Sequence, residues 1–88
     1  MLTAEVTVRN LLGLHARPIA RLVKTLSTSQ DSVILEKAGQ RADAKDIYQI
    51  MALDVQCGEH LRICVEGACE ADTLNTVVEL FNANFNEA

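Results

Sequence analysis

The sequence has little that would bind nucleic acid or cross a membrane. Eight Lys and Arg stand against twelve Asp and Glu, which gives a formal net charge of −4. A nucleic-acid binder needs a basic face that neutralises phosphates, so the acidic balance argues against that class. No apolar run approaches the roughly 20 residues of a membrane-spanning helix, and no secretory signal is recognisable. We therefore expect no membrane insertion and a cytoplasmic location.

The chain has only three cysteines, Cys57, Cys64 and Cys69, and an odd number does not form a complete disulfide framework. Their spacing with His60 contains neither a C-x-x-C nor an H-x-x-x-H pair, which argues against a zinc site. No base is recognisable beside Cys69, which argues against a catalytic thiol. We predict no metal and no cofactor, and interpret the cysteines as small packing residues in a reducing compartment.

Proline is nearly absent, and the single one, Pro18, closes the hexapeptide Gly13-Leu14-His15-Ala16-Arg17-Pro18. Proline is tolerated only in the first turn of a helix, so a helix is predicted to begin just after His15, its N-cap. The free N–H groups and the positive dipole end of a helix start attract anions such as phosphate. An imidazole is largely neutral and nucleophilic at pH 7. Arg17 adds a bidentate donor for phosphoryl oxygens, and Gly13 permits a tight turn.

Each of these residues also has an ordinary interpretation. A His at a helix start is more often a cap or a solvated side chain than a nucleophile. Arg21 and Lys24 follow Arg17 at helical spacing, and such residues usually solvate a helix face, although they also fit a steering role toward an acidic partner. Taken one by one, the residues leave both interpretations open.

Alternation and helical periodicity predict the order β-α-β-β-α-β-α. Period-two patterns indicate strands over residues 2–9, 32–37, 40–43 and 61–66, with Leu2, Ala4, Val6 and Val8 on a buried face. Apolar stripes indicate helices over 16–27 and 70–84, with Phe85 continuing the last stripe, and a short helix follows a cap at Asp46. These elements predict an α+β fold, a two-layer sandwich in which three helices cover one face of a four-stranded sheet. The length fits one domain, 1–88.

The hexapeptide resembles the active-site motif of the HPr family, the histidine phosphocarriers of the bacterial phosphoenolpyruvate-dependent phosphotransferase system. A second segment, Ala44 to Leu53 followed by Gly58, resembles the second signature of that family without needing a gap. The resemblance covers nearly the whole chain. It implies an HPr-like open-faced β-sandwich with an antiparallel sheet, a strand pairing that the patterns alone do not give.

The resemblance implies a phosphoryl carrier rather than an enzyme with a small-molecule substrate. Phosphorylated enzyme I would donate its phosphoryl group to Nδ1 of His15, giving a pros-phosphohistidine, and His15 would pass it to an enzyme IIA. The phosphoryl oxygens would face the N–H groups of Ala16 and Arg17. The relay would serve sugar transport or a nitrogen-related pathway. Met1 and the short C-terminal tail favour a free-standing carrier, which we expect to be a monomer.

The resemblance also implies roles for the short helix. Ile47, Tyr48 and Met51 would contact enzyme I and enzyme IIA on an apolar surface around the histidine. Apolar residues of such a helix are about as often core, and Tyr48 fits a contact role better. Asp46 stands where the serine-regulated branch of the family carries a phosphorylatable Ser, so that regulation is not expected here.

Features outside the two motifs lean toward the nitrogen-related branch, NPr: the segments Asn10 to Gly13, Leu53-Asp54, and Leu80 to Asn82 with Phe85. Two other functions stay open beside the carrier. One is a regulatory module of the same fold that binds proteins and transfers nothing, since a fold does not fix a function. The other is a small hydrolase that uses His15 and Arg17, which is disfavoured because no second acid or base accompanies them at suitable spacing.

Overall fold

The computed structural model describes residues 1–86, and its elements follow the predicted order. They are β1 (Leu2–Thr7), α1 (Ala16–Leu26), β2 (Ser32–Lys37), β3 (Gln40–Asp43), α2 (Ile47–Ala52), β4 (His60–Glu66) and α3 (Glu70–Asn82), followed by the short turn η1 (Asn84–Asn86). Residues 87–88, which the predicted domain includes, lie outside the described residues. Among residues 1–86, no helix has the length and apolar character needed to cross a membrane.

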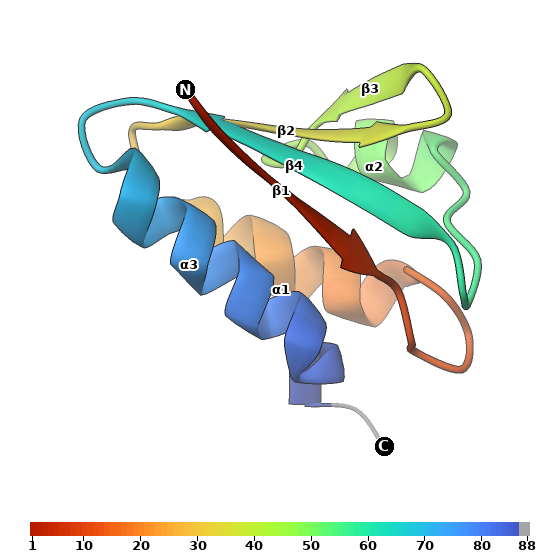
Figure 1. Ribbon diagram of the computed structural model, residues 1–88. Coiled ribbons are helices and arrows are strands. Elements are labelled where there is room, and N and C mark those ends of the chain that lie inside the picture. The colour runs from red at the N-terminus through yellow and green to blue at the C-terminus, as the bar shows by residue number, and fades with distance from the viewer. Residues whose placement is uncertain (87–88) are drawn as a thin grey trace.

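The strands form one antiparallel sheet in the order β1-β4-β2-β3. Ala38 and Gly39 make the turn between β2 and β3, and both have positive φ, as tight hairpin turns with this twist require. Figure 1 shows α1 and α3 side by side on one face of the sheet. The helix α2 contacts α1 and β3. The predicted open-faced α+β sandwich is therefore confirmed.

The core lies between the sheet and the helices, and its residues follow the two predicted periodicities. The fully buried members include Ile19, Leu22 and Leu26 from α1, Val77 and Phe81 from α3, and Val33, Leu35, Leu61, Ile63 and Val65 from the sheet. Pro18 and Ile19, at the start of α1, are buried, and Ile19 belongs to this core. The first turn of α1 is therefore held in place against the sheet.

Leu2 lies on the predicted face of β1, but the prediction that it is buried there is wrong. Its side chain is 38% exposed, whereas Val6 and Val8 on the same face are buried. The reason is its position, since β1 is an edge strand and Leu2 is the first residue of that edge. Burial in β1 therefore begins only toward its C-terminal half.

The predicted end of the last helix is also wrong, because α3 stops at Asn82 instead of reaching Asn84. Asn84, Phe85 and Asn86 have φ values of 52°, 53° and 62°, so the chain leaves the helix in a left-handed turn. Phe85 is still buried, and its ring meets the Phe81 ring edge-on at 4.8 Å between centroids. The turn places Phe85 and Asn86 in one pocket with residues of α1.

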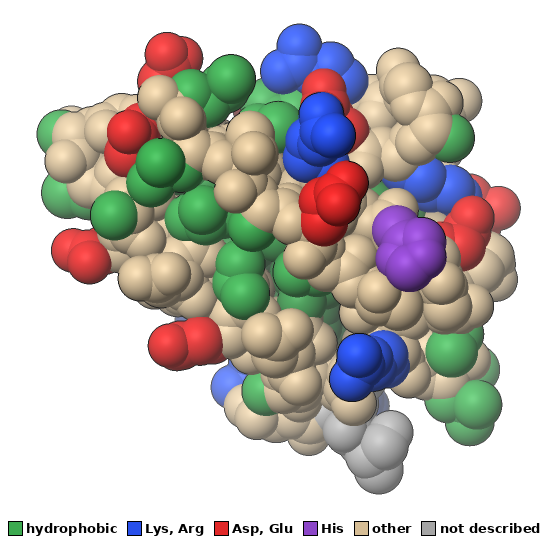
Figure 2. Space-filling model, viewed as in Figure 1, with side chains coloured by type: hydrophobic (Ala, Val, Ile, Leu, Met, Phe, Trp, Pro, Cys, Tyr) green, Lys and Arg blue, Asp and Glu red, His purple; other side chains and the backbone are tan. Residues whose placement is uncertain are grey.

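A row of alternating charges crosses the open face of the sheet. The register places Glu5 opposite Arg62, Arg62 opposite Glu36, and Glu36 opposite Arg41. Nitrogen–oxygen distances are 3.7 Å between Arg62 and Glu5 and 3.2 Å between Arg41 and Glu36. Figure 2 shows the resulting alternation of basic and acidic side chains. Exposed pairs of this kind contribute about 0–1 kcal/mol each, so we interpret this face as solvated surface.

Candidate functional site

His15 is the N-cap of α1, as predicted, with an extended backbone at φ −93° and ψ −173°. Its carbonyl oxygen accepts the N–H of Ile19 at 3.1 Å, which is the first hydrogen bond of the helix. Its side chain does not hydrogen-bond to the first-turn N–H groups of α1. The half-buried imidazole therefore stands beside the positive end of the helix without capping it.

The loop before His15 is fixed by backbone hydrogen bonds. The N–H of Leu14 donates to the carbonyl of Val55 at 2.9 Å, and the N–H of Gly13 donates to the carbonyl of Asn10 at 2.9 Å. Gly13 has φ +70°, and a Cβ there would overlap the Val55 carbonyl oxygen. Only glycine satisfies both conditions without strain, so the predicted tight turn at Gly13 is present.

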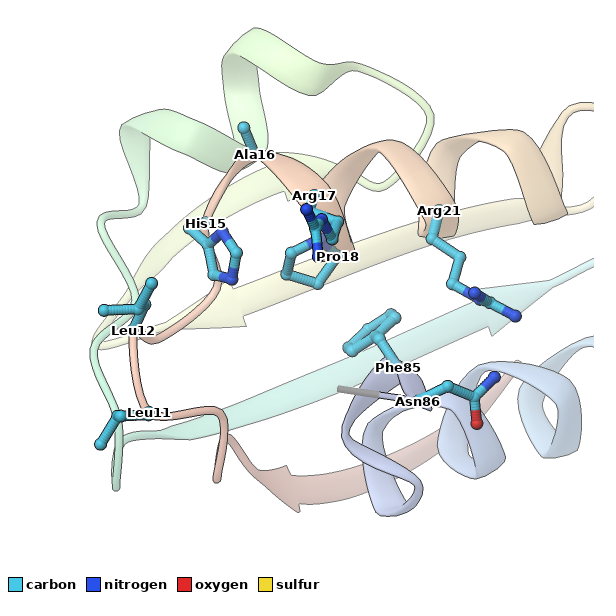
Figure 3. A pocket seen from close by; sticks show the side chains of 9 residues that line it. All are labelled: Leu11, Leu12, His15, Ala16, Arg17, Pro18, Arg21, Phe85 and Asn86. Atoms are coloured by element: carbon cyan, nitrogen blue, oxygen red, sulfur yellow. The ribbon is translucent and has the colours of Figure 1, made fainter. Parts of the chain in front are cut away.

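A pocket of about 840 Å³ opens beside His15. It is lined by Leu11, Leu12, His15, Ala16, Arg17, Pro18, Arg21, Phe85 and Asn86. Figure 3 shows His15 and the α1 residues Arg17, Pro18 and Arg21 on one side and Phe85 and Asn86, from the C-terminal turn, on the other. The pocket therefore brings together three of the predicted site residues, His15, Ala16 and Arg17, and residues of the distant C-terminal segment.

The sequence patterns missed part of this pocket. Leu11 and Leu12 are 83% and 72% exposed beside His15. The sequence marks them only as two consecutive leucines outside any periodic stripe, in a segment that resembles the nitrogen-related branch. Phe85 also belongs to that resemblance, but a helical continuation of α3 explained it equally well, and no pattern pointed to Asn86. Phe85 and Asn86 line the pocket because the chain makes a left-handed turn at Asn84–Asn86. Such a turn is usually predicted from a Gly, and none of these three residues is Gly.

The predicted docking residues lie on α2, outside this pocket. Tyr48 is 84% exposed, while Ile47 and Met51 are 37% and 51% exposed. Ile50 is buried at 1% and anchors the helix to the core. The core interpretation therefore applies to Ile50 and not to the other three, which leaves an exposed apolar surface on a helix in contact with α1.

Asp46 caps α2, as predicted. Its Oδ1 accepts the N–H groups of Tyr48 at 2.9 Å and Gln49 at 3.2 Å, and its Oδ2 accepts the Gln49 side-chain amide at 3.2 Å. The amide oxygen of Gln49 accepts in turn from the N–H of Asp43 at 2.9 Å. The carboxylate thus organises the start of the helix that carries Tyr48.

The cysteines lie apart from the pocket. Cys57 and Cys69 are exposed, and Cys64 is buried in β4. Burial, together with the nearby Glu36 carboxylate, raises the pKa of the Cys64 thiol. Among residues 1–86, no group of three or more His, Cys, Asp and Glu side chains is placed to hold a metal ion.

Comparison with known proteins identifies the family. The model of the PTS HPr component phosphorylation site matches residues 2–83. The chain is 40% identical over 87 residues to the phosphocarrier protein HPr of Xylella fastidiosa strain Temecula1, covering 99% of this chain and 98% of that protein. It is 32% identical over 84 residues to the phosphocarrier protein NPr of Proteus mirabilis, covering 94% and 93%.

A solved structure agrees with these relatives. The crystal structure of HPr-C-His from Thermoanaerobacter tengcongensis matches with a TM-score of 0.95 and 33% identity, covering 100% of this chain and 99% of that one. The chain therefore belongs to the HPr family of phosphocarrier proteins of the phosphotransferase system, which confirms the resemblance found in the sequence.

Proposed function

We propose that the chain carries a phosphoryl group on Nδ1 of His15, received from phosphorylated enzyme I and passed to an enzyme IIA. The observation that supports this most directly is the position of His15, at the N-cap of α1 and in one pocket with Arg17. The first-turn N–H groups and the helix dipole favour an anion at this place.

The transfer itself exchanges one P–N bond for another. The lone pair of unprotonated Nδ1 attacks the phosphorus, the bond from phosphorus to the donor histidine breaks, and its electron pair stays on the donor nitrogen. Passage to enzyme IIA repeats the exchange with His15 as the leaving group. Catalysis then consists of aligning the two histidines and stabilising the charge of a loose transition state. The N–H groups of Ala16 and Arg17 and the Arg17 guanidinium supply that stabilisation.

The exposed side chains of Ile47, Tyr48 and Met51 supply an apolar contact surface for both partners. Leu11 and Leu12 add apolar area on the pocket side of His15. Within this proposal the chain is one domain, 1–88, which acts as a cytoplasmic monomer and a carrier rather than an enzyme. Whether it serves sugar transport or a nitrogen-related pathway is decided by the enzyme IIA that accepts its phosphoryl group.

Incubation with purified enzyme I and labelled phosphoenolpyruvate tests the proposal. We expect an acid-labile, alkali-stable label on wild-type chain and none on His15→Ala. The matched control is His60→Ala, because the exposed His60 lies on β4 and its Nδ1 is 2.9 Å from Thr7 Oγ1, outside the pocket. Arg17→Ala should slow transfer by about 10- to 150-fold if the whole of one charge-assisted contact acts in the transition state.

The other outcomes identify the alternatives. Label on His15→Ala would refute His15 as the acceptor. An unlabelled wild-type chain would point to a regulatory module that only binds proteins, and free phosphate without a labelled chain would indicate a hydrolase. A panel of enzyme IIA proteins, each offered the labelled chain, then assigns the pathway.

A further inference from the structure

The carbonyl group that holds the loop before His15 belongs to a peptide unit with a second partner. The Val55 carbonyl accepts the N–H of Leu14 at 2.9 Å. The N–H of the same peptide unit, which belongs to Gln56, donates to Oε1 of Glu59 at 2.6 Å. A trans peptide unit is planar, and its C=O and N–H point in opposite directions. The Glu59 carboxylate therefore fixes the direction in which the Val55 carbonyl points.

Burial of the neighbouring side chains does not set this direction. Leu14 and Val55 are 6% and 3% exposed, so both side chains are anchored in the core. Such anchors fix the positions of side chains, but the peptide plane after Val55 keeps rotational freedom about the backbone bonds on either side of it. A flipped plane would turn the Gln56 N–H toward the Leu14 N–H, donor against donor. Because Glu59 accepts the Gln56 N–H, it opposes this flip.

Glu59 is itself held by Lys37, the last residue of β2. The Nζ of Lys37 lies 3.0 Å from Glu59 Oε1. The same Nζ donates to the carbonyl of Leu53 at 2.9 Å and to the carbonyl of Asp54 at 2.7 Å. An ammonium group has three donors, and these three acceptors use all of them. We call Lys37, Glu59 and the peptide unit between Val55 and Gln56 the Glu59 clamp.

The two charged residues of the clamp have no role in the family resemblance. Lys37 and Glu59 lie outside both sequence motifs, the hexapeptide and the segment from Ala44 to Leu53 with Gly58. The side chain of Lys37 is only 19% exposed, so its contacts are partly shielded from water. The clamp is therefore a feature of this chain that its contacts reveal and its motifs do not.

We propose that Glu59 is a positioning residue for phosphoryl transfer. It acts through Val55 and Leu14: the clamp aims the Val55 carbonyl at the Leu14 N–H, and Leu14 directly precedes His15. The inference rests on the proposed function, because the position that it protects is the alignment of His15 with the histidine of a partner. Small displacements of a reacting group lower the rate of a step that depends on alignment.

Transfer from phosphorylated enzyme I, measured against the concentration of this chain, tests the proposal. Glu59→Ala removes the acceptor and should lower kcat about 3- to 10-fold with KM nearly unchanged, because the exposed side chains of α2 remain in place. Glu59→Gln keeps an amide oxygen for the Gln56 N–H and should restore kcat to within about 2-fold of wild type, although it loses the charge that faces Lys37. The matched control, Glu66→Ala, removes an exposed carboxylate at the other end of β4 and should keep the wild-type kcat.

Hydrogen exchange of the Leu14 N–H measures the clamp without enzyme I. We expect this exchange to be about 10-fold faster in Glu59→Ala and close to the wild-type rate in Glu59→Gln. The internal control is the N–H of Ala44, which donates to the carbonyl of Val33, near the start of β2, at 2.9 Å. Its exchange should keep the wild-type rate in both variants.

Three results overturn the inference while the wild-type chain still accepts the phosphoryl group. The first is a wild-type kcat in Glu59→Ala, and the second is an equal loss of kcat in Glu59→Gln and Glu59→Ala. The third is equal acceleration of Leu14 and Ala44 exchange in Glu59→Ala, which would show a general loss of stability. Failure of the wild-type chain to accept any phosphoryl group from enzyme I overturns the proposed function, and with it the transfer step that Glu59 is proposed to support.

Discussion

The carbonyl oxygen of Val55 accepts the N–H of Leu14 at 2.9 Å, and this bond ties the residue before His15 to the loop after α2. The same carbonyl lies against the Cα of Gly13, where it leaves no space for a side chain. The hexapeptide and the loop within the second motif, between Leu53 and Gly58, therefore meet at one backbone oxygen. The position of His15 depends on both.

Gly13→Ala should destabilise the chain by about 2 kcal/mol or more, because it combines a strained positive φ with an overlap on backbone atoms. The matched control is Gly39→Ala, since Gly39 has φ +83° and open space around its Cα. The stability lost in Gly39→Ala should therefore reflect only the cost of a positive φ at an alanine. Chemical denaturation of the two variants measures the difference, and equal losses would mean that the loop near Val55 yields at little cost.

The order of elements and the placement of His15 could be predicted because they depend on local features. Alternation, apolar stripes and a single Pro each act over a few residues. The end of α3 could not be predicted in the same way. Phe85 fits a helical stripe, yet it lies in a left-handed turn whose Asn84 carbonyl accepts a hydrogen bond from Asn10 Nδ2, near the other end of the chain. The far wall of the pocket is therefore a tertiary effect, which local propensity does not encode.

The exposure of individual side chains on α2 could not be predicted from the sequence either. Ile47, Ile50 and Met51 fit one apolar stripe, yet only Ile50 is buried. A helix of six residues makes fewer than two turns, and α2, which contacts α1 and β3, turns only part of its apolar face to the core. The stripe predicted the helix correctly but did not reveal which of its members are available to a partner.

Glu59, in the loop between α2 and β4, should make the stability of the folded chain depend on pH in the acid range. Its Oε1 accepts the N–H of Gln56 at 2.6 Å and lies 3.0 Å from Lys37 Nζ, and these two partners, in that order, lower the pKa of Glu59 below its usual value of 4.5. A lowered pKa in the folded state means that the stabilisation is present above the unfolded value and is lost as the pH falls through the folded value.

Glu59→Gln should therefore give a shallower fall in unfolding free energy as the pH drops below about 4.5. The control is Glu66→Gln, which removes an exposed carboxylate at the other end of β4. Denaturation series over this pH range check the expectation. Parallel curves for wild type and Glu59→Gln would show that the Lys37–Glu59 contact has no net effect on stability.

Tyr48→Ala should weaken binding of enzyme I by about 1–2 kcal/mol, as expected for an exposed aromatic residue in an interface. Because Tyr48 is 84% exposed, its removal should change the unfolding free energy by only about 0.5 kcal/mol. Ile50→Ala in the same helix should show the opposite pattern, with a loss of about 2–5 kcal/mol in stability. Calorimetric binding and denaturation of both variants test this, and unchanged binding by Tyr48→Ala would remove α2 from the interface.

Asp46 combines a cap with a permanent negative charge beside the proposed docking surface. Asp46→Asn keeps an oxygen for the Tyr48 and Gln49 N–H groups, but its amide group faces the Gln49 amide, whose oxygen already accepts from Asp43. We therefore expect a loss of about 0.5–1 kcal/mol for Asn and about 1–2 kcal/mol for Ala.

The charge of Asp46 should act on the partner rather than on the fold. If enzyme I is acidic where it meets α2, Asp46→Asn removes a repulsion and should make transfer modestly faster at low salt. The gain should fade at high salt, because exposed charges about 10 Å apart are screened at 0.1 M ionic strength. Asp46→Ala, which removes charge and cap together, should share the gain in rate but lose more stability. Transfer rates measured across ionic strength decide the matter: a wild-type rate for Asp46→Asn at every salt concentration would leave Asp46 as a helix cap alone.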